Sequence, residues 1–173
     1  MSRDLILQAE HVTLAFGGVK ALSDISIDIP RHQIVSIIGP NGAGKTSMLN
    51  VVNGVYQPQE GQIVFEGKIH ERIDPVKAAR MGICRTFQNV ALFKGMSTLD
   101  NVMAGRALKF RATFFQQAFQ GRRAVAEELH HREVVERVIE FLDLRAIRHT
   151  PGGKLPYGFQ KRVELARAPA SEP

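Results

Sequence analysis

A glycine-rich stretch at residues 37–47, IIGPNGAGKTS, has the residue types that a polyphosphate-binding loop needs. Its glycines let the backbone approach a ligand without a Cβ clash, so that successive N–H groups can face phosphate oxygens. The ammonium of Lys45 can bridge two phosphates, and the hydroxyl of Thr46 can ligate Mg²⁺. The stretch fits the pattern G-x-x-x-x-G-K-[ST]. We therefore predict a phosphate-binding loop (P-loop), and its expected ligand-binding residues are Gly39, Pro40, Asn41, Gly42, Ala43, Gly44, Lys45, Thr46 and Ser47.

A phosphate-binding loop is expected to follow a strand and to open a helix, and the segments on either side of this loop have these two patterns. Residues 33–39, QIVSIIG, form a nearly continuous, β-branched run, which is typical of a strand buried on both faces of a parallel sheet. Residues 45–54 carry apolar side chains at helical spacing and end at Gly54. Strand, loop and helix together indicate half of a βαβ unit. This context disfavours the alternative of a glycine-rich turn with a chance lysine.

Several further segments have strand patterns. Residues 5–16 and 25–30 alternate apolar and polar side chains, which predicts two half-buried strands in an antiparallel edge layer. Residues 61–67 indicate another strand with a hairpin turn at Gly67, and residues 83–88 indicate a further buried strand.

Helices are expected mainly in the second half of the chain. Residues 74–82 predict a short helix that is capped by Gly82, and Ser97 with Asp100 resembles a capping box that opens the next helix. Residues 121–144 have an amphipathic period that includes Phe141. Residues 149–158 indicate a turn-rich loop, and a last helix starts at residue 159. We expect this helix to end near Arg167 because Pro169 has no N–H.

Composition limits the class of protein. No apolar run approaches the roughly 18 residues of a membrane span, and the first residues lack the apolar stretch of a signal peptide, so we expect a cytosolic chain. The single Cys84 allows no internal disulfide, and the six histidines show no metal-ligand spacing. The net charge of +6 comes largely from cations interleaved with glutamates, which favours a solvated helix face over a nucleic-acid patch. These residues are Lys109, Arg111, Arg122, Arg123, Arg132 and Arg137, with Glu127, Glu128, Glu133 and Glu136.

Two later segments narrow the class of P-loop protein, since the loop alone occurs in proteins of many functions. No N-K-x-D stretch is present for reading guanine, which disfavours a GTPase. The segments RTFQ at 85–88 and LPYGFQKRVELARA at 155–168 follow GPNGAGKTS in order. Together they resemble the Q-loop, signature and Walker A segments of ATP-binding-cassette (ABC) nucleotide-binding subunits. AFGGVKAL, ARMGICRTFQNVALF and MSTLDNV resemble most the ATP-binding subunits of branched-chain amino acid importers.

The resemblance implies an α/β fold, the P-loop NTPase fold of ABC type. It comprises an antiparallel β edge layer, a parallel-sheet core and a helical subdomain, and here its C-terminal part is expected to be missing. Residues 1–94 would form the nucleotide-binding core with the P-loop and Q-loop. Residues 95–160 would form the helical subdomain with the signature region, and residues 161–173 the start of the second half of the core.

The resemblance also implies roles for single residues, with ATP and Mg²⁺ as cofactors. Phe16 would stack on adenine; the alternative is an ordinary core phenylalanine. Gln88 would sense Mg²⁺ and the γ-phosphate and relay their state, so it joins Thr46 as an implied metal contact and is the one implied catalytic residue. Its alternative is a surface amide after a strand. Leu155, Tyr157 and Gly158 match the signature loop, which in this family contacts the γ-phosphate bound by the opposite subunit.

The chain departs from the family pattern in two places. Pro156 stands at the usual serine of L-S-G-G-Q, Tyr157 at the first glycine and Phe159 at the glutamine, so we expect weakened phosphate recognition across a dimer. The Walker B aspartate, the catalytic glutamate and the switch histidine, which follow the signature helix in the family, do not occur before Pro173. We therefore expect a partial cassette that binds ATP without steady hydrolysis, because phosphoryl transfer depends on such positioning groups. The lost strand neighbour would leave an apolar edge at residues 33–39.

The leading hypothesis is an energy-coupling, ATP-binding subunit of an amino-acid importer, peripheral on the cytoplasmic face of the cell membrane. Its implied partners are transmembrane permease subunits and a second ATP-binding subunit, and no direct nucleic-acid contact is expected. Two alternatives stay open. One is a non-transport ABC ATPase associated with nucleic acid, which the net charge of +6 leaves open, and the other is a non-hydrolytic regulatory nucleotide binder.

Overall fold

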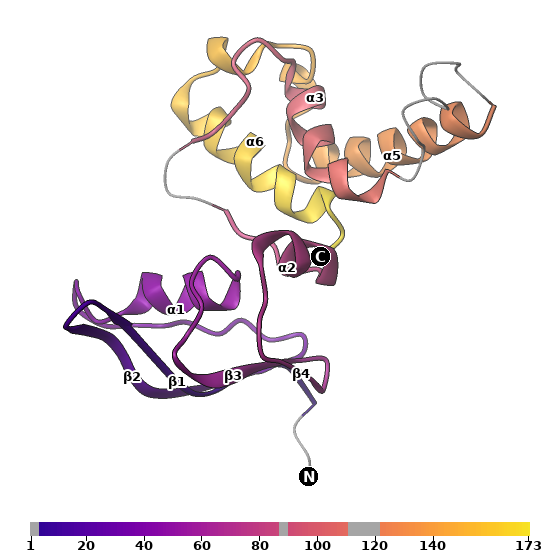
Figure 1. The fold of residues 1–173 in the computed structure, drawn as a ribbon. Coiled ribbons are helices and arrows are strands. Elements are labelled where there is room, and N and C mark those ends of the chain that lie inside the picture. Colours follow the sequence, from indigo (N-terminus) through magenta and orange to yellow (C-terminus); the bar gives the residue numbers. More distant parts are fainter. Residues whose placement is uncertain (1–3, 87–89, 111–121) are drawn as a thin grey trace. The chain divides into compact units, whose positions relative to one another are not determined.

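The computed structural model describes residues 4–86, 90–110 and 122–173, the last range without the side chains of 122–124. The chain divides into two compact units, residues 1–83 (unit 1) and 84–173 (unit 2) (Figure 1). Each unit has its own hydrophobic core and is described by itself. The finer division expected from the sequence, at residues 94 and 160, stays a prediction.

Unit 1 contains a four-stranded antiparallel sheet in the order β2-β1-β3-β4 (Figure 1). The strands are β1 (Leu5–Phe16), β2 (Val19–Pro30), β3 (Glu60–Phe65) and β4 (Lys68–His70). The strands predicted at residues 5–16, 25–30 and 61–67 are therefore confirmed, and β2 starts earlier than its alternating pattern indicated. The turn predicted at Gly67 is also confirmed. Glu66 and Gly67 have φ values of +51° and +73°, as a two-residue hairpin turn with the right twist requires.

The core of unit 1 lies between this sheet and helix α1 (Lys45–Val52). Along β1 the buried side chains are Leu7 and Ala9, and then Val12 and Leu14. The alternation shifts by one residue because the pairing of β1 with both neighbours is irregular between Ala9 and Val12. Met48 and Val51 of α1 are buried in this core, as the helical spacing predicts.

Helix α2 (Pro75–Met81) follows the sheet, and it ends at the Gly82 cap that the sequence indicated. The carboxylate of Asp74 accepts a hydrogen bond of 2.8 Å from the N–H of Lys77, which caps the first turn. Gly82 closes the helix with φ of +97°, a conformation that suits glycine.

Residues 33–39 do not form the predicted buried strand. The side chain of Ile34 is 99% exposed and that of Ile38 is 92% exposed. A strand needs neighbours that satisfy its N–H and C=O groups, and no described strand pairs with this segment. The apolar side chains of this segment are exposed, but the strand whose edge they were expected to form is absent, so only the loop and helix of the predicted βαβ half-unit are confirmed.

Unit 2 is helical (Figure 1). Its elements are α3 (Thr98–Met103), η1 (Ala104–Lys109), α5 (Arg122–Phe141), η2 (Arg145–Ile147), η3 (Gly152–Lys154) and α6 (Tyr157–Ala170), where η marks a 3-10 helix. Apolar side chains of α3, α5 and α6, including Val102, Ile139 and Val163, pack into one core. The capping box is confirmed, since Ser97 accepts a 3.1 Å hydrogen bond from the N–H of Asp100. The strand predicted at residues 83–88 is wrong for residues 83–86, which form no strand; the remainder lies outside the described residues.

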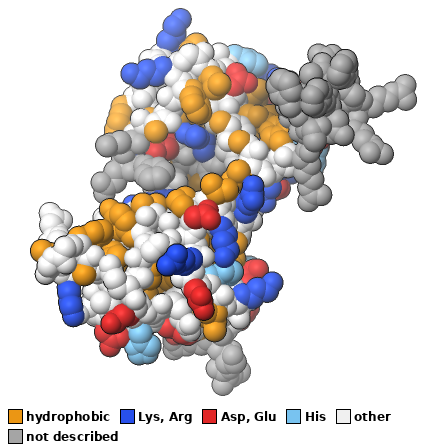
Figure 2. Space-filling view, in the orientation of Figure 1, with side chains coloured by type: hydrophobic (Ala, Val, Ile, Leu, Met, Phe, Trp, Pro, Cys, Tyr) orange, Lys and Arg blue, Asp and Glu red, His pale blue; other side chains and the backbone are white. Residues whose placement is uncertain are grey.

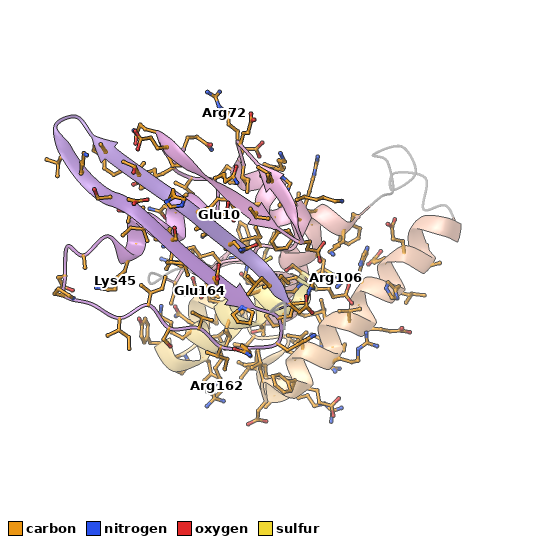
Figure 3. All side chains as sticks on the ribbon, turned by 90° about the horizontal axis from the view of Figure 1, so that it is seen from below. Glu10, Lys45, Arg72, Arg106, Arg162 and Glu164 are labelled. Atoms are coloured by element: carbon orange, nitrogen blue, oxygen red, sulfur yellow. The ribbon has the colours of Figure 1, made fainter. Side chains whose placement is uncertain are left out.

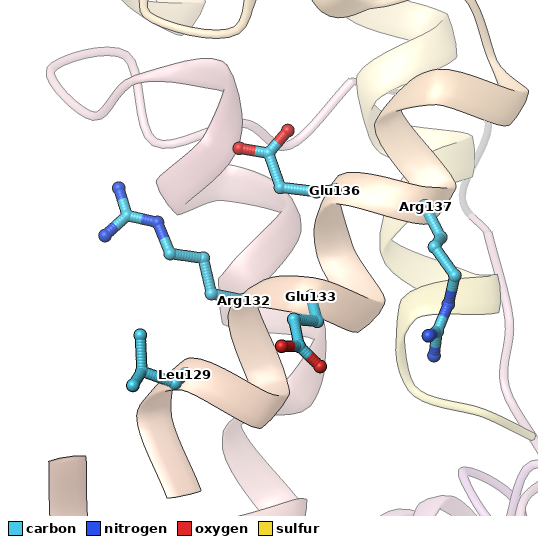
Figure 4. Close-up of a pocket in the computed structure, with 5 residues that line it drawn as sticks. All are labelled: Leu129, Arg132, Glu133, Glu136 and Arg137. Carbon is cyan, nitrogen blue, oxygen red and sulfur yellow. The ribbon is translucent and has the colours of Figure 1, made fainter. Parts of the chain in front are cut away.

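The charged side chains of α5 project outward around the helix, as Figure 4 shows for Arg132, Glu133, Glu136 and Arg137. Cations and carboxylates are also interspersed on the face of unit 1 that Figure 2 shows. This exposure fits the expected solvated helix face for the described part of α5, whereas the choice between that face and a nucleic-acid patch stays a prediction. Phe141 is an exception to the predicted apolar face, because it is 83% exposed at the end of the helix.

Helix α6 starts at Tyr157, two residues before the expected start, and continues past Arg167 to Ala170, so the expected end at Arg167 is wrong. Pro169 lies in the last turn, where its missing N–H removes only one intrahelical hydrogen bond. The N–H of Ser171 closes the end by donating to the carbonyl of Ala168 over 3.1 Å. None of the helices in the described ranges is long and apolar enough to cross a membrane.

Candidate nucleotide-binding site

The glycine-rich loop leads directly into the first turn of α1. Gly44 is the N-cap residue of this helix, with φ of +79°, and no side chain caps it. The first intrahelical hydrogen bond runs from the N–H of Met48 to the carbonyl of Gly44 over 2.9 Å. The N–H groups of residues 45–47 therefore precede the hydrogen-bond ladder of the helix. A helix start of this kind presents N–H donors and the positive end of the helix dipole to an anion.

Gly44 also packs tightly against β2. A Cβ atom at this position would lie 2.5 Å from the carbonyl oxygen of Ala21 and 2.8 Å from Cδ2 of Leu22. Glycine is required here both by this approach and by its positive φ. Gly42 has φ of +85° but open space around it. The loop is thus fixed to the sheet at Gly44 and open at Gly42.

The side chain of Lys45 turns back over the loop that precedes α1 (Figure 3). Its Nζ donates to the carbonyl oxygens of Gly39 at 2.7 Å and Pro40 at 2.6 Å. An ammonium group has three N–H donors, so one remains for a phosphate oxygen. The carbonyls therefore hold the charge of Lys45 in place over the loop.

These features fit a triphosphate with its magnesium ion. The loop offers N–H groups, a fixed ammonium and open space at Gly42, and Thr46 is exposed at the start of α1. Thr46 would supply a hydroxyl ligand to Mg²⁺. When bound, a nucleoside triphosphate would supply the phosphoryl bond whose hydrolysis can drive work. The predicted P-loop residues 39–47 lie on the loop before α1 and on the first turn of this helix, whereas their contacts with a ligand stay predictions.

Phe16 ends β1 at the hairpin that leads into β2. It pairs with Val19, two residues before the Ala21 that touches Gly44, so Phe16 and the P-loop belong to neighbouring parts of unit 1. Its side chain is 48% exposed. The sequence reasoning missed Tyr56, whose ring meets that of Phe16 edge to face with 5.0 Å between centroids. Forty residues separate the two rings in the chain, so no local pattern links them.

The signature segment belongs to unit 2. Leu155 is buried in its core, at 5% exposure, whereas Tyr157 is 67% exposed and a side chain at position 158 would have open space. Pro156 stands at the N-cap of α6 and offers no side-chain hydrogen bond. Gln160 donates to the carbonyl of Leu155 over 2.7 Å, so its amide is used within the segment. Gln88 lies outside the described residues, and the roles of all these residues stay predictions.

Comparison with known proteins places these features in context. The family model described as ABC transporter matches residues 22–173. A relative from Pseudomonas aeruginosa, the high-affinity branched-chain amino acid transport ATP-binding protein BraF, is 35% identical over the whole chain and 68% of its own length. A probable branched-chain amino acid transport ATP-binding protein, LivG from Archaeoglobus fulgidus, is 36% identical over 94% of the chain and 62% of its own length.

A crystal structure of the ADP conformation of an ATP-binding cassette from an ABC transporter is also similar. The match covers 98% of this chain and 66% of the chain in that structure, with a TM-score of 0.81 and 32% identity. The fold class expected from the sequence is therefore confirmed. The chain spans about two thirds of the length of the relatives that it matches.

Proposed function

Because the chain belongs to the ABC transporter family, we propose that it is an ATP-binding, energy-coupling subunit of an ABC importer. The observation that carries this proposal is the hold of the Gly39 and Pro40 carbonyls on Lys45, at the start of a helix that has no side-chain cap. This arrangement suits the phosphate tail of a nucleotide, with Mg²⁺ held by Thr46 and, in the family pattern, sensed by Gln88.

We propose branched-chain amino acids as the cargo, because the names of the relatives state that class for those proteins. The partners would be transmembrane permease subunits and a second ATP-binding subunit, with the chain on the inner face of the membrane. Tyr157 and Gly158 would face the nucleotide of that second subunit. A Gly158→Asp change would place a carboxylate there and weaken nucleotide-driven association.

The test is nucleotide binding by the 173-residue chain, measured by calorimetry with Mg²⁺ and ATP. Lys45→Ala should weaken binding about 10- to 100-fold, because it removes a charge-assisted hydrogen bond to phosphate. Lys68→Ala, an exposed lysine on β4, is the matched control and should leave the affinity unchanged. Equal affinities of Lys45→Ala and the unchanged chain would overturn the proposal. Salt-sensitive binding to duplex DNA, with no response to ATP, would instead favour the nucleic-acid alternative.

A further inference from the structure

We infer that Tyr56 and Gln59 are positioning residues that hold Phe16 in place as a platform for the nucleotide base. The inference deepens the proposed function and rests on it, because it assumes that a base lies against Phe16. Neither residue belongs to the P-loop. Both come from the short segment between α1 and β3, and each supports a different part of the end of β1.

Tyr56 supports the ring of Phe16. The two rings are inclined at 73° with centroids 5.0 Å apart, which is a favourable edge-to-face arrangement. Tyr56 is partly buried, whereas 48% of Phe16 remains exposed. One part of the Phe16 ring is therefore held by protein and another part is open to a ligand.

Gln59 supports the backbone directly before Phe16. Its side-chain Oε1 accepts from the N–H of Ala15 at 2.8 Å, and its Nε2 donates to the carbonyl of Ala15 at 3.1 Å. The backbone N–H of Gln59 also donates to the carbonyl of Thr13 at 3.0 Å. The amide side chain thus continues the β1–β3 ladder by two further hydrogen bonds beyond its last pair, Thr13 with Glu60.

The segment that carries Tyr56 and Gln59 is itself well anchored. Gly54 is buried with φ of +73°, and an added Cβ would lie 2.4 Å from the carbonyl oxygen of Ile73. The N–H groups of Val55 and Tyr56 donate to the carbonyl of Asn50 at 2.8 and 3.1 Å. Since the support is held by the end of α1, the position of Phe16 is coupled to the helix that the P-loop opens.

A platform that is fixed before binding loses less conformational entropy when the base stacks on it. The support should therefore act on binding of the base and leave binding of the phosphates unchanged. This difference separates a positioning role from a general structural role, because unfolding of unit 1 would weaken both kinds of binding.

The experiment measures two ligands with each variant of the full chain, Mg²⁺-ATP and Mg²⁺-tripolyphosphate, which has no base. Tyr56→Ala and Gln59→Ala should each weaken ATP binding about 2- to 10-fold and leave tripolyphosphate affinity unchanged. Tyr56→Phe keeps the ring and should retain full affinity. Gln62→Ala is the control for Gln59, because the Gln62 amide donates to the carboxylate of Glu10 at 2.7 Å and contacts a different part of β1.

The outcomes separate this inference from the proposed function. If Phe16→Ala weakens ATP binding whereas Tyr56→Ala and Gln59→Ala do not, the positioning role is wrong and the nucleotide site stands. If affinities for ATP and tripolyphosphate fall together in both variants, the two residues are merely structural and the inference fails. Gln59→Glu, of nearly equal size, keeps one of the two hydrogen bonds and tests this point should Gln59→Ala fail to fold. If the unchanged chain binds neither ligand, both proposals fail.

Discussion

Arg106 donates a hydrogen bond of 2.8 Å from its Nε to Nδ1 of His131, and both side chains are buried in unit 2. The same guanidinium donates to the carbonyl of Ala170 at 2.7 Å and to the carboxylate of Glu172 at 3.0 Å. One side chain of η1 thus joins α5 to the end of α6. These contacts help to explain why α6 persists through Pro169, since Arg106 satisfies one of its last carbonyls.

This arrangement makes the stability of the chain depend on pH. Nδ1 of His131 accepts from Arg106, so Nε2 carries the proton, and Nε2 is buried without a hydrogen-bond partner among the described residues. Burial lowers the pKa of His131 below its ordinary 6.5, and the adjacent Arg106 lowers it further, against the opposing effect of Glu127 and Glu172. The folded chain therefore binds a proton less readily than the unfolded chain does. The contribution of His131 to the free energy of unfolding should be fully present above about pH 6.5 and should be lost as the pH drops below this value.

The measurement is the free energy of unfolding by urea between pH 8 and pH 5. His131→Gln keeps an acceptor for Arg106 but does not titrate, so its stability should change less over this range. Part of the pH dependence should remain, because burial also lowers the pKa of His70. Glu172, whose pKa is lowered from 4.5 chiefly by its hydrogen bond from Arg106, acts only at more acidic pH. Identical pH profiles for His131→Gln and the unchanged chain would contradict this prediction.

Gly44→Ala should destabilise unit 1 more than Gly42→Ala does. Both substitutions place a side chain at positive φ, which costs about 1–2 kcal/mol. Only the Cβ at position 44 would also collide with the backbone of β2, at 2.5 Å from the Ala21 carbonyl oxygen. We expect a total loss of about 3 kcal/mol for Gly44→Ala. Thermal unfolding of the two variants checks this, and equal losses would show that the approach to β2 is not rigid.

Asn101 organises the segment before α3. Its side chain is fully buried, accepts from the N–H of Phe93 at 2.8 Å, and donates to the carbonyls of Phe93 and Ser97, both at 3.0 Å. Asn101→Asp replaces the donor with a second acceptor that faces these carbonyls, so we expect a loss of about 3 kcal/mol. Asn53→Asp, at a less buried site with one hydrogen bond to the Leu49 carbonyl, is the control and should cost less. Similar unfolding free energies for the two variants would rule out this role of Asn101.

The features that the sequence predicted correctly are mostly local. The turn at Glu66 and Gly67, the cap at Ser97 and the loop that opens α1 each depend on residues a few positions apart. Their geometry follows from backbone preferences and from hydrogen bonds within one turn. The helix start at Gly44 could therefore be predicted from residue spacing, whereas the close approach of Gly44 to Ala21 of β2 could not.

The features that could not be predicted from the sequence join distant parts of the chain. The contact of Phe16 with Tyr56 and the link from Arg106 to His131 depend on how whole elements pack. The strand predicted at residues 33–39 failed for the same reason. A β-branched apolar run indicates a strand only where other strands complete its hydrogen bonds, and here no described strand does.

The difference between the predicted strand and the exposed segment at residues 33–39 can be tested. Ile38 is 92% exposed, so Ile38→Glu should change the free energy of unfolding by less than about 0.5 kcal/mol. It should also raise the protein concentration at which the chain aggregates, because it adds a charge to an apolar edge. Ile63→Glu, at a β3 position that is only 3% exposed, is the control and should prevent folding of unit 1. Chemical unfolding and light scattering give the two readouts. A loss of several kcal/mol for Ile38→Glu would mean that residues 33–39 form a buried strand in solution, as their sequence pattern indicates.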